Sequence, residues 1–352
     1  MKTILAGICA ALGVLNCARA WNAEGHMVTA QIAYNHLTPA ARAACDALIA
    51  VPLANNSPGT SNFVTAAVWA DDFKTPLGTA IWHFIDIPFS LDGTPTNGVG
   101  AAAFDVVQAI HLCTTNLLDT SDTPSNRAVS LRYLLHFVGD IEQPLHCSTA
   151  VSASSPGGDA GGNGFSITGD WSNLHSLWDA GGGYLTNSIA RPLTAGGQSV
   201  LNAKVAAIET DYPYNYTNNV GTIPDPLTWA LEGWSLAQTI SYVGITRNSS
   251  PSGTYLTNAM ATTEQRMAAG GHRLADLLNT LLTPPTLTTI AQPAGNFKFS
   301  WNAISNVVYR LQWKAQLSDP SWRDLTTLTA SSNSASFMES LSQTQRFYRV
   351  VR

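Results

Sequence analysis

Histidine and aspartate recur four residues apart at two places in the chain. His136 and Asp140 form one pair, His175 and Asp179 form the other, and His146 lies between them. On a helix this spacing puts both side chains of a pair on one face. Imidazole nitrogen and carboxylate oxygen both suit Zn²⁺, and an open coordination position allows catalysis. A single histidine is more often a hydrogen-bonded core residue, but two such pairs with His146 predict a zinc site.

Several further motifs lie N-terminal to these pairs, and together with the pairs they form an ordered series along the chain. In sequence they are Trp21, His26, Trp69-Ala70-Asp71, His83-Phe84-Ile85-Asp86, Leu135-His136-Phe137-Val138-Gly139-Asp140, Gln143-Pro144-Leu145-His146, and Asn173-Leu174-His175 with Trp178-Asp179. This series closely resembles the zinc-dependent single-strand nucleases of fungi and plants, the S1/P1 nuclease family. The resemblance runs from Trp21 to Asp179, and beyond about Gly183 only a helical pattern continues.

The resemblance implies three zinc ions held by nine residues of this chain. The implied ligands are Asp71, His83, His136 and Asp140 for the first ion, His146, His175 and Asp179 for the second, and His26, Asp140 and Trp21 for the third. Asp140 would bridge two ions, and Trp21 would contribute its α-amine and its carbonyl. An α-amine can donate a lone pair only if it is a free terminus, so this ligand requires cleavage before Trp21.

The activity that the resemblance implies is hydrolysis of single-stranded DNA and RNA to 5′-nucleotides. Whether the protein also has 3′-nucleotidase activity is left open by the sequence. Metal ions would activate water and neutralise phosphate charge. Asp71, Asp140 and Lys74 are the implied catalytic residues, with Lys74 near the scissile phosphate. The implied substrate pocket consists of Phe84, which stacks on a base, Asp86, which hydrogen-bonds it, and Asn163 in Gly161-Gly162-Asn163. Stacking tolerates any base, which suits a non-specific enzyme.

The N-terminal segment is typical of a secretory signal peptide. Lys2 precedes an apolar run from Ile4 to Leu15, and Ala18-Arg19-Ala20 is an A-x-A cleavage site. The run is too short for a permanent membrane span, which disfavours an uncleaved anchor. We therefore expect residues 1–20 to be removed between Ala20 and Trp21, leaving a secreted or periplasmic protein.

Composition restricts the class of protein further. Hydrophobic residues make up 45% of the 352 residues and charged residues 12%, which suits a globular protein with a large core. The formal net charge is -5, whereas a sequence-independent duplex binder would be basic, so bound metal cations would have to attract nucleic acid. Only Cys45, Cys113 and Cys147 remain after cleavage, which allows at most one disulfide. A monomer is expected.

Periodicity predicts a mainly α protein with a small β-sandwich at its C-terminus. Helical spacing appears at Val28 to Leu37, Pro39 to Ile49, Ala101 to Leu118, Asn126 to Ile141, Leu227 to Val243 and Thr262 to Leu281. Alternating segments follow at Phe297 to Phe299, Val307 to Trp313, Trp322 to Leu328 and Phe347 to Val351. We expect an all-helical phospholipase C/nuclease-like domain at 21–284 and a module at 285–352 that loosely resembles fibronectin type III, with Trp301, Trp313 and Trp322 in its core.

Two other functions fit parts of this pattern. Bacterial zinc-dependent phospholipase C has a related fold and the same N-terminal tryptophan ligand, but it typically uses Glu where this chain has Asp179. The base pocket at Phe84, Asp86 and Asn163 also favours a nuclease. A catalytically inactive secreted binding protein is the second alternative, and the complete set of implied ligands argues against it.

Overall fold

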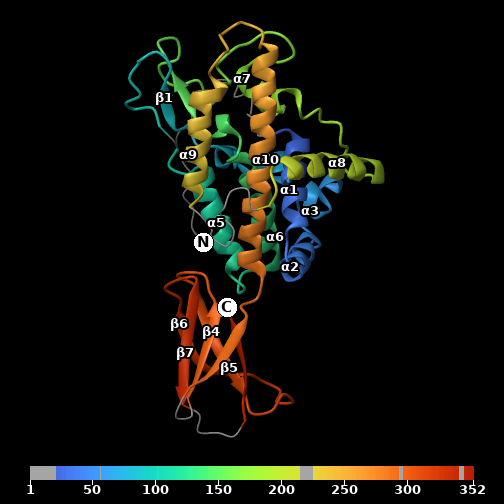
Figure 1. Cartoon of the computed structure of the whole chain (residues 1–352), viewed down its shortest axis with the longest axis vertical. Coiled ribbons are helices and arrows are strands. Elements are labelled where there is room, and N and C mark those ends of the chain that lie inside the picture. The colour runs from blue at the N-terminus through green and yellow to red at the C-terminus, as the bar shows by residue number, and fades with distance from the viewer. Residues whose placement is uncertain (1–20, 56, 101, 215–224, 293–295, 341–344) are drawn as a thin grey trace.

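The computed structural model describes residues 21–352 except 56, 101, 215–224, 293–295 and 341–344. The expected signal peptide, residues 1–20, lies outside them. Helices occupy the first part of the chain and antiparallel strands the last part, which confirms the predicted fold class (Figure 1). Among the described residues, no helix combines the length and the apolar character needed to cross a bilayer.

Helices of very different lengths build the larger part. The α-helices are α1 (Ala23–Asn35), α2 (Pro39–Ile49), α3 (Phe63–Ala66), α4 (Trp69–Leu77), α5 (Val106–Leu118), α6 (Pro124–Asp140), α7 (Leu174–Asp179), α8 (Ala195–Asp211), α9 (Pro226–Leu236) and α10 (Gly253–Leu282). The short turns η2 (Ala80–His83) and η3 (Pro144–Cys147) also carry site residues, and β1 (Pro88–Ser90) pairs in parallel with β2 (Thr149–Val151).

The long helix α10 runs through this part and packs against α1 and α6 (Figure 1). The approach to α1 is close at Gly271, where an added Cβ would lie 2.4 Å from Cγ2 of Ile32. Any larger residue at this position would push the two helices apart. The core between the helices is apolar and includes Ile32, Phe137 and Leu274, all fully buried. It holds α1 and α6, which carry site residues, at a fixed separation.

Capping residues decide where two of the predicted helices begin. α5 starts at Val106 rather than at Ala101, because the Asp105 side chain accepts hydrogen bonds from the N–H groups of Val107 and Gln108. α6 starts at Pro124, two residues before the predicted start, because Thr123 is its N-cap. Proline is favoured there, since the first N–H of a helix has no partner to lose.

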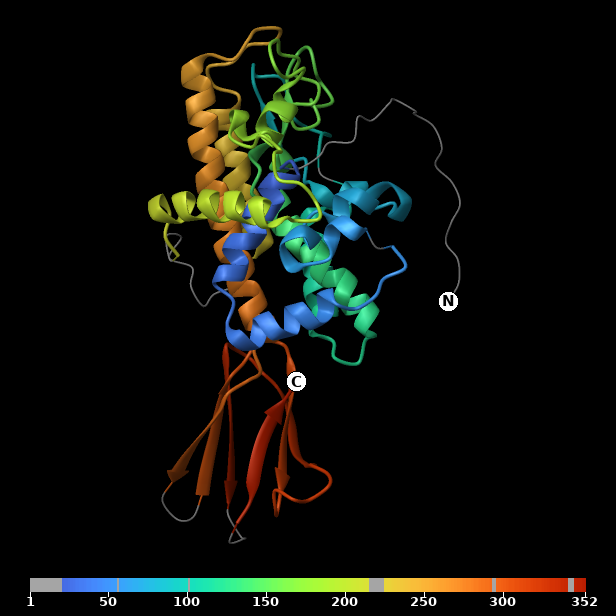
Figure 2. The ribbon, with the colours of Figure 1, turned by 90° about the vertical axis from the view of Figure 1, so that its right-hand side faces the viewer.

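The C-terminal module is a sandwich of two three-stranded sheets. Its strands are β3 (Leu287–Gln292), β4 (Asn296–Asn302), β5 (Val308–Lys314), β6 (Arg323–Thr329), β7 (Ser334–Ser340) and β8 (Phe347–Val351), in the orders β3-β4-β7 and β6-β5-β8. Figure 2 shows this module below the helices, and the Arg352 guanidinium donates to the carbonyls of Leu281 and Thr283 at the end of α10.

The aromatic core of the module differs from the prediction. Trp301 is buried with Phe299 and Tyr309, as expected. Trp313 and Trp322 are only half-buried, so their placement in the core was wrong. Cationic side chains cover them instead: Arg323 and Arg346 lie over the ring of Trp313, and Lys314 and Arg349 lie over that of Trp322. Cation–π contact thus replaces apolar packing at these two positions.

Candidate metal centre

The histidines and aspartates singled out in the sequence come from six separate elements. α6 carries His136 and Asp140, α7 carries His175 and Asp179, η3 carries His146, α4 carries Asp71, η2 carries His83, and α1 carries His26. All four histidines that lie outside α7 are essentially fully buried. The fold brings these residues together into two neighbouring clusters, one around Asp140 and one around Asp179.

Asp140 lies at the centre of the first cluster. Its Oδ2 atom is 3.0 Å from Nδ1 of His83 and 3.3 Å from Nε2 of His136. Its other oxygen, Oδ1, is 3.5 Å from Nε2 of His26. One carboxylate therefore presents a different oxygen to two separate groups of imidazoles, which is the arrangement that a bridging ligand requires.

Asp71 approaches the same cluster from α4. Its Oδ1 atom is 3.7 Å from Nε2 of His136 and 3.9 Å from Nδ1 of His83. The Lys74 ammonium lies one turn further along the helix and donates to the same oxygen at 3.0 Å. Lys74 is buried, so its positive charge is held at the edge of the cluster and is not dispersed in solvent.

The second cluster consists of His146, His175 and Asp179. The Oδ1 atom of Asp179 lies 3.5 Å from Nε2 of His175 and 4.0 Å from Nε2 of His146. The Gln143 side chain donates to this oxygen from Nε2 at 2.9 Å and so orients the carboxylate. The i,i+4 spacing of the α7 pair therefore has the consequence expected from the sequence, with His146 brought in from η3.

Backbone carbonyls orient three of the imidazole rings. Nδ1 of His136 donates to the carbonyl of Ala67 at 2.6 Å, that of His146 to the carbonyl of His83 at 2.8 Å, and that of His175 to the carbonyl of Gly161 at 2.7 Å. A carbonyl can only accept, so the proton is on Nδ1 and Nε2 keeps its lone pair. In each ring Nε2 is the nitrogen that faces the carboxylates, as in a metal-binding histidine.

The clusters contain more acceptors than the described residues can satisfy. Neither oxygen of Asp140 and neither ring nitrogen of His26 has a hydrogen-bond partner among those residues, although both side chains are fully buried. Burial raises the pKa of Asp140 well above its ordinary value and lowers the pKa of His26 well below its own. A bound cation would remove both costs, because it stabilises the carboxylate and uses the imidazole lone pair. The donor set of imidazoles and carboxylates therefore fits zinc.

Trp21 lies against the second cluster. The N–H of Asn22 donates to the carbonyl of Asp179 at 3.0 Å, and the Trp21 side chain is fully buried. Gly25 permits this placement, since a Cβ there would lie 2.6 Å from Cβ of Trp21. The family resemblance implies that Trp21, as the first residue of the mature protein, belongs to the site. In the structure Trp21 lies beside Asp179.

The three expected pocket residues flank the clusters. The N–H of Ile85 donates to the carbonyl of His146 at 2.8 Å, which holds Phe84 and Asp86 beside η3. Asn163 follows the two glycines whose carbonyls accept from His175, and its own amide donates to Ala160 at 2.8 Å. Within the part of the chain that the structure describes, no hydrogen bond, ion pair or ring contact joins Phe84, Asp86 and Asn163 to one another.

Asp159 is a buried acidic residue beside the site that the sequence reasoning missed. Its buried carboxylate accepts hydrogen bonds from the N–H groups of Ala150 and Gly162 and from the hydroxyl of Tyr242. It thereby fixes the glycine-rich loop that carries Asn163. Burial raises the pKa of Asp86 to about 6, and the charge of Asp159 adds to the rise. The only signal in the sequence was a single acidic residue inside that loop, since its partners lie far along the chain.

This geometry agrees with the comparisons to known proteins. The family model "S1/P1 Nuclease" matches residues 21–283, and the chain belongs to this family. It is similar to Nuclease P1 of Penicillium citrinum, with 28% identity over 74% of this chain and 97% of that protein. It is also similar to Nuclease S1 of Aspergillus oryzae, with 26% identity over 81% of this chain and 100% of that protein. A third similar protein is Endonuclease 2 of Arabidopsis thaliana, with 28% identity over 74% of this chain and 89% of that protein.

Proposed function

We propose that the chain is a zinc-dependent endonuclease that hydrolyses phosphodiester bonds of single-stranded DNA and RNA to 5′-nucleotides, with 3′-nucleotidase activity in addition. Its membership of the S1/P1 nuclease family and its similarity to proteins named as nucleases and endonucleases support this proposal. The observation that carries it is the buried carboxylate of Asp140, which faces three imidazoles and receives no hydrogen bond from the described residues.

Three zinc ions per chain would be held by the nine expected residues. Asp71, His83, His136 and Asp140 would hold the first, His146, His175 and Asp179 the second, and His26, Asp140 and the amine and carbonyl of Trp21 the third. When bound, zinc lowers the pKa of water and neutralises charge on the phosphate oxygens. The separation of the two clusters and the two-sided presentation of Asp140 support this division.

The protein side chains would then bind the base of the substrate and offset the negative charge of its phosphate. Lys74 lies 3.0 Å from Asp71 at the edge of the first cluster and would contact the phosphate undergoing attack. Phe84 would stack on a base, with Asp86 hydrogen-bonded to that base and Asn163 beside it. Stacking on an aromatic ring accepts every base, so this pocket would bind without sequence preference.

The proposal includes the processing of the chain. Residues 1–20 would direct the protein out of the cytoplasm to a secreted or periplasmic location, and their removal would leave Trp21 as its first residue. Residues 21–284 would form the nuclease domain and residues 285–352 a separate fibronectin-III-like module, and the mature chain would act as a monomer. Two observations support this arrangement: Trp21 is buried, and the N–H of the next residue, Asn22, donates to the carbonyl of Asp179. Together they place the new terminus beside the clusters.

Direct comparison of substrates tests the proposal against phospholipase activity. Purified mature protein would be assayed side by side on single-stranded DNA, on RNA and on phosphatidylcholine. We expect release of 5′-nucleotides and no hydrolysis of lipid, and hydrolysis of lipid without nucleotide release would overturn the proposal. The zinc content of the same preparation tests the alternative of an inactive binding protein, which fewer than two bound ions per chain would favour.

A further inference from the structure

A third cluster of metal-binding side chains lies away from the two clusters of the proposed active site. It consists of His36, which directly follows α1, Glu209 on α8 and His272 on α10. One ligand atom from each lies within 4.8 Å of the other two. His26 and His36 are separated by ten residues along α1, which places the clusters about 15 Å apart along the helix axis. None of the three residues belongs to the expected ligand set.

His272 is the residue whose environment needs an explanation. Its side chain is 1% exposed, and neither ring nitrogen has a hydrogen-bond partner among the described residues. The rings of His36 and Tyr214 pack against it edge-on, at 5.5 and 5.2 Å between centroids. A buried imidazole whose nitrogens are both unsatisfied is costly, and coordination to a metal ion would satisfy one of them.

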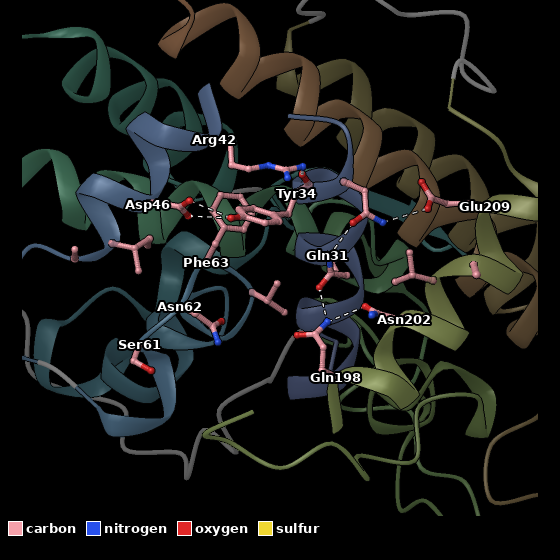
Figure 3. A pocket seen from close by; sticks show the side chains of 16 residues that line it. Gln31, Tyr34, Arg42, Asp46, Ser61, Asn62, Phe63, Gln198, Asn202 and Glu209 are labelled. Atoms are coloured by element: carbon pink, nitrogen blue, oxygen red, sulfur yellow. Dashed lines mark hydrogen bonds between the residues drawn. The ribbon is translucent and has the colours of Figure 1, made fainter. Parts of the chain in front are cut away.

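Glu209 and His36 form the accessible side of this cluster. Nε2 of His36 is in contact with Oε1 of Glu209, and their side chains are 25% and 21% exposed. Glu209 also lines a cavity of about 730 Å³ together with Gln31 and Asn202, where Figure 3 shows its carboxylate at one end. An ion can therefore reach the cluster from solvent on the side of His36 and Glu209.

The sequence around His272 repeats a spacing already met in the site. His272 and Asp276 are four residues apart on α10, as are His136 and Asp140 on α6. Asp276 does not reach the ligand atoms directly. Instead its carboxylate accepts from the hydroxyl of Tyr214, whose ring stacks on His36 at 4.2 Å. Asp276 thus fixes the Tyr214 ring, which in turn stacks on the imidazole of His36.

We propose that His36, Glu209 and His272 bind one further zinc ion, distinct from those of the active site. Two imidazoles and one glutamate are an established donor set for zinc, with a fourth position left to water. The ion would fasten the end of α1 to α8 and α10. Its role would be structural, because the cluster lies away from Asp140 and contains no residue of the substrate pocket.

The zinc content of purified full-length mature protein and of matched variants tests this proposal. Wild type, Glu209→Gln and His272→Asn would be dialysed against zinc-free buffer and their zinc measured by mass spectrometry. His111→Asn is the control, since the exposed His111 lies 3.4 Å from Asp225 in an ordinary surface contact. We expect one zinc ion fewer per chain in the first two variants, no loss in the control, and cleavage of single-stranded DNA within about twofold of wild type in all.

Glu209→Gln keeps the test decisive if His272→Asn fails to fold, because Glu209 is partly exposed and glutamine preserves its shape. Equal zinc content in Glu209→Gln and wild type would overturn the proposal. Its failure is distinguishable from failure of the proposed nuclease function. An inactive wild type that still loses one zinc ion on Glu209→Gln substitution would contradict the nuclease function and support the further site.

Discussion

The N–H of Asn22 donates a hydrogen bond of 3.0 Å to the carbonyl of Asp179. This bond joins the second residue of the expected mature chain to a residue at the C-terminal end of α7. Trp21 is consequently buried beside a proposed zinc ligand and not on the surface, where most chain termini lie. The position of the terminus is therefore part of the site, and its chemistry can be tested by changing the terminus alone.

Adding one alanine before Trp21 should reduce activity at least about tenfold, because the α-amine would become an amide nitrogen without a lone pair for zinc. The measurement is kcat/KM on a single-stranded oligonucleotide, with zinc content determined on the same samples. The same alanine added after Arg352 is the control and should change neither quantity. Full activity of the N-terminally extended protein would exclude the amine as a ligand.

Asp140→Asn should lower kcat/KM by at least about 100-fold, because even outer-shell partners of metal ligands contribute roughly 10–100-fold. An amide keeps the shape of the carboxylate but cannot bridge two cations. Asp170→Asn, a change at an exposed aspartate in a loop, should leave the activity unchanged. If Asp140→Asn binds as much zinc as wild type and retains its activity, Asp140 is not a ligand.

Phe84→Ala should raise KM and leave kcat nearly unchanged, since the proposed contribution is base stacking and not catalysis. Stacking of a base on an aromatic side chain is worth roughly 1–3 kcal/mol, which corresponds to about 5- to 150-fold in KM. Phe84→Trp is the matched control and should preserve binding. A fall in kcat with KM unchanged would instead place Phe84 among the residues that shape the metal clusters.

Asp86→Asn should change how stability depends on pH. Burial raises the pKa of Asp86 from 3.8 to about 6, and the charge of Asp159 adds to the rise. The folded protein therefore binds more protons than the unfolded chain between these pH values, and stability falls as pH rises through this window. The variant lacks this loss. At pH 7.5 it should therefore be more stable than wild type by about 3 kcal/mol, since one pKa unit corresponds to about 1.36 kcal/mol.

Urea unfolding of both proteins at pH 4.5 and 7.5 measures the effect on stability. The advantage of Asp86→Asn should be about 1 kcal/mol at pH 4.5, near the lower end of the window from 3.8 to about 6, and should be larger at pH 7.5. Asp170→Asn again provides an exposed comparison, for which no such difference is expected. An advantage that is equal at both pH values would show that the substitution acts through packing and not through the charge of Asp86.

The ligand pairs were accessible from the sequence because helical spacing is a local property. His136 and Asp140 lie one turn apart wherever a helix forms, and the same holds for His175 and Asp179. What spacing does not reveal is the distance between elements. That Trp21 lies beside Asp179 depends on packing of α1 against distant loops, and only the family resemblance placed it in the site.

Elements without a clear apolar pattern were missed. α8 buries only Leu201, Val205 and Ile208 along its length and has two glycines in its first turn, so its periodicity is weak. β7 is rich in serine and mostly exposed, which hides its alternation. The cluster at His36, Glu209 and His272 escaped for another reason: its residues come from three parts of the chain that are far apart in sequence, so no local spacing joins them.

The dependence of nuclease activity on zinc tests the central claim most directly. Hydrolysis of single-stranded DNA by the mature protein would be measured before chelation, after removal of metal with a chelator, and after zinc is returned. Activity should be lost on removal and restored by zinc, because the buried oxygens of Asp140 and the lone pairs of the surrounding imidazoles form a site only around cations. Activity that persists in fully metal-free protein would contradict the account.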